Sequence, residues 1–100
     1  HPKGFQRFNE YKNEFLLHFI RCNIERGITE GYYRSDIHLE IMSRFRLESM
    51  MIPFDIALYP PTQFNMAETA QLIAENFIYG LATLEGHQLI QSYKQTEKNS

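Results

Sequence analysis

The sequence predicts an all-α domain of four antiparallel helices, and three observations support this prediction. From Phe5 to Ile28 the apolar residues recur at gaps of three and four, with two adjacent pairs, which is the 3.6-residue period of an amphipathic helix held for about six turns. Further segments with helical periodicity follow, and Pro60-Pro61 separates the second from the third. No stretch alternates apolar and polar residues as a half-buried strand does.

Composition restricts the classes of function. One hundred residues suffice for one domain with one core. The net charge is −2, and Arg44 and Arg46 form the one basic cluster, so the chain itself lacks the positive face that grips nucleic acid. Cys22 is the single cysteine, which excludes an intrachain disulfide and favours a reducing, cytoplasmic location. No apolar run is long enough for a membrane span.

The first helix is expected from about Phe5 to Glu30, after an extended start over residues 1–4. Its exposed face carries i,i+4 pairs, Arg21 with Glu25 and Arg26 with Glu30. Gly31 lies where a helix end requires a positive φ.

A second helix is expected from about Leu39 to Ile52, with Ser35, Asp36 or His38 as its cap. Its apolar residues spread over most of the circumference, which predicts a largely buried helix. Glu40, Arg44 and Glu48 form an i,i+4 ladder on the remaining face. Pro53 limits this helix.

The third helix is expected to begin at Met66, after Asn65 as N-cap, and to end at Ala82. One of its stripes is rich in alanine and allows a close helix neighbour. Thr83 is the cap candidate for a fourth helix from about Leu84 to Gln95, with a frayed tail beyond.

No catalytic motif is present, so we expect no enzyme and no cofactor. Glu14, His18 and Cys22 share one helix face and could bind a metal. A histidine at the edge of the core and a buried, inert thiol are the favoured interpretation, so no metal site is predicted.

Methionine and phenylalanine side chains on the first two helices could surround a cavity for a small apolar molecule. Each of these residues suits a filled core equally well. The candidate ligand-binding residues are Phe15, Phe19, Cys22, Met42, Phe45 and Met50.

Two segments carry a family resemblance. Residues 27–37 read Gly-Ile-Thr-Glu-Gly-Tyr-Tyr-Arg-Ser-Asp-Ile, and residues 80–87 read Gly-Leu-Ala-Thr-Leu-Glu-Gly-His. Both segments resemble helix junctions in the C-terminal domains of TetR/AcrR-type bacterial transcriptional regulators. The residues that match, which we expect to form a structural corner, are Gly27, Gly31, Arg34, Asp36, Gly80, Thr83 and Gly86.

The resemblance implies a domain that binds a small effector and dimerises, and so controls a helix-turn-helix DNA-binding domain, commonly in a repressor. No helix-turn-helix precedes residue 5, so DNA would be contacted through a domain absent from this chain. The last two helices would form a four-helix bundle with those of a dimer mate. The interface residues implied are Ala67, Ala70, Ala74, Phe77, Ile78, Leu81, Leu89, Ile90 and Tyr93.

Two alternatives remain. The chain could be a purely structural helical dimerisation module with a filled core and no ligand. It could also be a small helical enzyme or metal protein, which the absence of any motif disfavours.

Overall fold

The computed structural model describes residues 2–99, with the side chains of residue 10 and residues 13–98. Over this range the predicted all-α fold of four helices is confirmed, and no strand is present. The elements are α1 (Pro2–Thr29), α2 (Leu39–Ser49), a short 3₁₀ helix η1 (Ile52–Phe54), α3 (Met66–Leu81) and α4 (Leu84–Asn99). None of the helices in the described part of the chain is long and apolar enough to cross a membrane.

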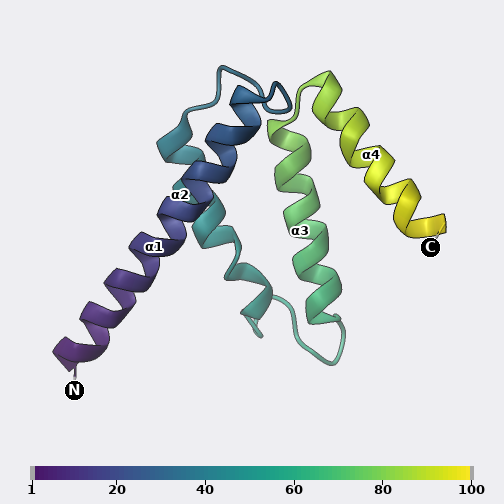
Figure 1. The fold of residues 1–100 in the computed structure, drawn as a ribbon. Coiled ribbons are helices and arrows are strands. Elements are labelled where there is room, and N and C mark those ends of the chain that lie inside the picture. The colour runs from purple at the N-terminus through teal and green to yellow at the C-terminus, as the bar shows by residue number, and fades with distance from the viewer. Residues whose placement is uncertain (1, 100) are drawn as a thin grey trace.

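Successive α-helices run in opposite directions, and α4 splays away from α3 (Figure 1). Helix α2 packs along α1, and η1 leads on to the long connection that returns to α3 (Figure 1). The radius of gyration is 16.0 Å, whereas a compact domain of this length has about 13 Å. The single chain is therefore an open arrangement of helices.

Local signals explain most helix boundaries. Gly31 has a φ of 82° immediately beyond α1, as its position predicts. Of the three cap candidates for α2 the structure uses His38, whose Nδ1 accepts a hydrogen bond from the Ile41 N–H at 3.2 Å. The Asn65 side chain caps α3 by accepting from the Glu68 N–H at 2.9 Å. These caps satisfy backbone donors that have no partner within the helix.

Three predicted boundaries were wrong. Helix α1 begins at Pro2 rather than Phe5, because proline is tolerated in a first turn, where its missing N–H is not needed. Helix α2 ends at Ser49, three residues before the predicted end, and the chain tightens into η1 around Pro53. Helix α4 continues to Asn99.

The core is small and lies where the second half of α1 meets the end of α3. Its buried apolar residues are Ile20, Ile24 and Leu81. Ser43 is also fully buried, and its hydroxyl donates a 2.7 Å hydrogen bond to the Leu39 carbonyl, so no polar atom is left unsatisfied there.

The prediction that the second helix is largely buried was wrong. Ile41 and Phe45 of α2 are 58% and 55% exposed. Apolar residues around a helix predict burial only where other elements cover every side. In this open chain α1 and α3 leave part of α2 uncovered.

Candidate functional site

The two segments that carry the family resemblance pack against each other. The Arg34 N–H donates to the Leu81 carbonyl and the Thr83 N–H donates to the Tyr32 carbonyl, both at 2.9 Å. These bonds flank an antiparallel bridge between residues 33 and 82. The end of α1 and the turn between α3 and α4 therefore form one unit, which we call the junction (residues 27–36 and 80–86).

Side chains reinforce the junction. The Arg34 guanidinium donates to the Gly80 carbonyl at 3.0 Å and to the Asp36 carboxylate at 3.2 Å. Gly80 lies in the last turn of α3, where a cation interacts favourably with the helix dipole. Arg34 therefore ties the segment after α1 to the C-terminal end of α3.

Two junction glycines are required by close packing. A Cβ on Gly86 would lie 2.0 Å from the Tyr32 carbonyl oxygen, and one on Gly27 would lie 2.3 Å from the Tyr33 ring. A Cβ on Gly80 would have no neighbour within 4 Å. Gly27 and Gly86 permit the close approach, whereas Gly80 contributes its backbone carbonyl.

Two apolar grooves flank Phe77 of α3. The η1 groove, of about 420 Å³, lies between α2, η1 and α3. The α1 groove, of about 270 Å³, lies between α1, α2 and α3. The η1 groove is lined by Phe45, Ser49, Ile52, Tyr59, Leu72, Ile73, Asn76 and Phe77. The α1 groove is lined by Leu16, Phe19, Ile20, Asn23, Ile24, Tyr33, Arg46, Met50, Phe77 and Ile78.

Phe77 lies between residues of α2 that face different grooves. Its ring stacks on that of Phe45, with centroids 5.9 Å apart and planes inclined by 24°. The Arg46 guanidinium carbon lies 5.5 Å from the centre of the same ring. A single aromatic side chain therefore borders both grooves.

The six candidate ligand residues do not form one site. Phe19 and Met50 line the α1 groove, and Phe45 lines the η1 groove. Met42 packs against the core. The remaining two, Phe15 and Cys22, are exposed outside both grooves.

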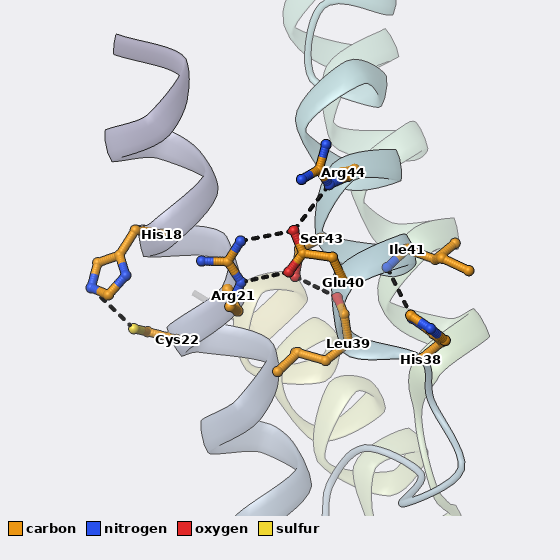
Figure 2. A network of polar contacts seen from close by, with 9 residues as sticks. All are labelled: His18, Arg21, Cys22, His38, Leu39, Glu40, Ile41, Ser43 and Arg44. Carbon is orange, nitrogen blue, oxygen red and sulfur yellow. Dashed lines mark hydrogen bonds and ion pairs between the residues drawn. The ribbon is translucent and has the colours of Figure 1, made fainter. Parts of the chain in front are cut away.

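The expectation of a buried thiol was wrong. Cys22 is exposed, and its Sγ lies 3.6 Å from the ring Nε2 of His18 on the side of α1 that faces away from α2 (Figure 2). Within the described side chains no group of three or more potential ligands could hold a metal ion, so Glu14 does not complete a site with this pair.

An ion-pair network that sequence reasoning missed joins α1 to α2 (Figure 2). The Arg21 guanidinium donates two hydrogen bonds, of 2.9 and 3.0 Å, to the Glu40 carboxylate. The Arg44 Nε donates to the same carboxylate at 2.9 Å, as the i,i+4 ladder predicts. Hydrogen bonding to Arg21 lowers the pKa of Glu40. Spacing within one helix suggested Glu25 as the partner of Arg21 and could not reveal a pair between helices.

The predicted dimer residues lie on α3 and α4 and do not form one surface. Ala74, Ile78, Ile90 and Tyr93 line an open groove of about 280 Å³ between α3 and α4, which we call the α3–α4 groove. Leu89 lies beside it in a neighbouring groove with Ile78 and Ile90.

The other predicted interface residues lie elsewhere. Phe77 faces α2. Leu81 is only 1% exposed and belongs to the core, so it offers no surface to a partner. Ala70, seven positions before Phe77 on α3, is half-buried, whereas Ala67 is exposed near the start of α3. These four residues therefore lie outside the α3–α4 groove.

Comparisons of the chain with family models, curated proteins and solved structures gave no match.

Proposed function

We propose that this chain is the ligand-sensing and homodimerising domain of a TetR/AcrR-type transcriptional regulator. The observation that carries the proposal is the junction. The two segments that resemble the family are far apart in the sequence, yet they lie together through backbone hydrogen bonds, the Arg34 contacts and close packing at Gly86. The two segments therefore form one structural unit, which supports the interpretation that they belong to one family pattern.

The junction would couple a ligand to the dimer surface. Helix α1 contributes Ile20 and Ile24 to the wall of the α1 groove, and it enters the junction at Gly27, one turn later. The junction in turn holds the start of α4. A ligand that shifts α1 against α3 would therefore change the angle at which α4 leaves the domain.

The α3–α4 groove supports homodimerisation. Ala74, Ile78 and Ile90 provide an apolar part of its lining, beside the ion pair between Lys94 and Glu75 that links α4 to α3. Figure 1 shows that α4 splays away from α3. The small Ala74 side chain permits close approach of another helix. A second copy related by a two-fold axis would place its own α3 and α4 against the same surface and form a four-helix bundle.

The mass of the chain in solution, by light scattering at micromolar concentration, tests this proposal. We expect a dimer of twice 11.9 kDa. Ala74→Arg should produce monomers because the long, charged side chain would fill the space that the small Ala74 leaves for a partner helix. Ala57→Arg is the matched control, since Ala57 is exposed in the connection after η1, and it should remain a dimer. A monomeric parent chain, or a dimer unaffected by Ala74→Arg, would contradict the proposed interface.

A purely structural dimerisation module is the alternative. It predicts the same mass and the same response to Ala74→Arg. It differs in the grooves beside Phe77, which would be filled in solution and would bind no small molecule. Ligand binding to the dimer therefore separates the two functions.

A further inference from the structure

The α1 groove contains a single charged side chain, Arg46, among its described lining residues. Apolar side chains provide most of the remaining wall, and Asn23 and Tyr33 are its other polar members. No carboxylate belongs to this described lining. Its chemistry is thus that of an apolar surface with one positive charge.

Arg46 differs from the other arginines whose side chains are described. Arg21, Arg26, Arg34 and Arg44 each form an ion pair with a carboxylate. None of the ion pairs among the described side chains involves Arg46, whose guanidinium lies over the Phe77 ring instead. The aromatic face compensates a cation less well than a carboxylate does.

The surroundings of Arg46 desolvate it. Burial lowers the pKa of its guanidinium, and burial also raises the pKa of the neighbouring Tyr33 hydroxyl. A partly buried cation without a counter-ion is unfavourable for the single chain, because removal of water from a charge is costly unless the charge is paired. An anion that enters the groove would remove this penalty.

We propose that Arg46 anchors the carboxylate of a small apolar acid whose hydrocarbon part lies in the α1 groove against Phe19 and Met50. This inference rests on the proposed sensing function and names the chemical class of its effector. The planar guanidinium can donate two parallel hydrogen bonds to the two oxygens of a carboxylate.

The groove favours a monocarboxylate over a phosphate ester. A phosphate carries more negative charge, and the described lining holds no second cation to balance it. The volume of about 270 Å³ lies near the lower limit for ligand pockets, about 300 Å³, which favours a short acid. The flexible Met50 side chain can adapt to the shape of the hydrocarbon part.

Isothermal titration calorimetry of the full chain with octanoate, hexanoate and benzoate tests the proposal. At least one of these acids should bind, whereas 1-octanol should bind more weakly than octanoate and octylamine should not bind. Failure of all three acids to bind would overturn the proposal, as would equal binding of octanoate and octylamine.

Substitutions of Arg46 test whether this residue binds the carboxylate. Arg46→Gln should weaken acid binding about tenfold or more, because it removes a charged hydrogen-bond donor. Arg46→Lys should retain part of the affinity, since it keeps the charge without the planar fork. Arg44→Gln, on the same helix but outside the groove, should bind as the parent chain does. Circular dichroism would confirm that each variant is folded. Unchanged binding by folded Arg46→Gln would overturn the assignment.

The mass measured on the same samples separates this inference from the proposed function. A dimer that binds none of the acids would remove the anchor and leave dimerisation intact. A monomer that binds octanoate through Arg46 would retain the site and contradict the homodimeric regulator.

Discussion

The Thr83 hydroxyl donates a 2.7 Å hydrogen bond to the Gly31 carbonyl, which lies 52 residues earlier in the chain. The same hydroxyl oxygen accepts a hydrogen bond from the Gly86 N–H at 3.1 Å and so caps α4. One side chain thus begins a helix and attaches it to the end of α1. The Thr83 hydroxyl oxygen therefore takes part both in the local cap of α4 and in the long-range contact with Gly31.

Thr83→Val should lower the free energy of unfolding by about 1–2 kcal/mol, because it removes both hydrogen bonds and keeps the side-chain shape. Urea denaturation measures the change. Thr96→Val is the matched control, since the Thr96 hydroxyl bonds within exposed α4 to the Ser92 carbonyl, and it should change the stability by less than about 0.5 kcal/mol. Equal effects of the two substitutions would show that Thr83 does not join the two segments.

Alanine substitutions at Gly86 and Gly80 should change the free energy of unfolding in opposite directions. A Cβ on Gly86 would meet the Tyr32 carbonyl oxygen at 2.0 Å, so Gly86→Ala should destabilise the fold by about 1–3 kcal/mol or more. Gly80 lies in α3 with space around it, so Gly80→Ala should stabilise by about 0.4–1 kcal/mol. Thermal unfolding of both variants measures the signs. If Gly86→Ala unfolded at the same temperature as the parent chain, the close packing of Gly86 on Tyr32 would contribute nothing to the stability of the fold.

The features that the sequence predicted well are local. The caps at Asn65 and Thr83 are hydrogen bonds between residues three positions apart, and the positive φ of Gly31 accompanies a hydrogen bond from the Tyr32 N–H to the Gly27 carbonyl, five positions earlier. A cap is recognisable from an asparagine or threonine before a helix, and a positive φ from a glycine after one. Residue spacing does not predict that the two junction segments pair with each other. Of the residues that the resemblance singled out, Arg34 and Thr83 take part in the pairing, whereas the bridge itself joins Tyr33 to Ala82.

The features that the sequence did not predict depend on how helices cross. Apolar residues around α2 indicated burial, but Phe45 remains more than half exposed because the stacked Phe77 ring covers only part of it. The bond between Arg21 and Glu40 requires α1 and α2 to meet at one register, which intrahelical periodicity does not specify. Likewise, Cys22 lies on an apolar-rich helix but on its outer side.

The link between Arg21 and Glu40 should make stability depend on pH. The pKa of Glu40 is lowered in the folded chain, chiefly by its hydrogen bond to Arg21. Its stabilising contribution is therefore fully present above the ordinary glutamate value of 4.5 and is lost as the pH falls through the lower folded pKa. Glu40→Gln should reduce stability at pH 7, and the difference from the parent chain should disappear in acid.

Urea denaturation of both proteins from pH 7 down to pH 3 would measure this dependence. Glu48→Gln, an exposed position on the same helix, is the control and should show little difference from the parent chain at any pH. High salt should also reduce the effect of Glu40→Gln, since the pair is partly exposed to solvent. A difference that does not change with pH would exclude an ionic contribution from Glu40.

Alanine substitutions at Leu81 and Phe45 should distinguish open grooves from a filled core. Leu81 is fully buried, so Leu81→Ala should lower the free energy of unfolding by about 2–5 kcal/mol. A filled core would give a similar or larger cost, about 3–5 kcal/mol, for Phe45→Ala. Because Phe45 is half exposed in the η1 groove, we expect about 1–1.5 kcal/mol instead.

Both variants should be unfolded in urea at one protein concentration, since dimerisation would otherwise shift the apparent stability. A Phe45→Ala cost as large as that of Leu81→Ala would show that another surface covers the η1 groove in solution. Together with failure of the chain to bind any small molecule in the α1 groove, that result would favour the structural dimerisation module, because both grooves would then lack a ligand. A small cost would show that the η1 groove is open in solution, as the exposure of Phe45 indicates.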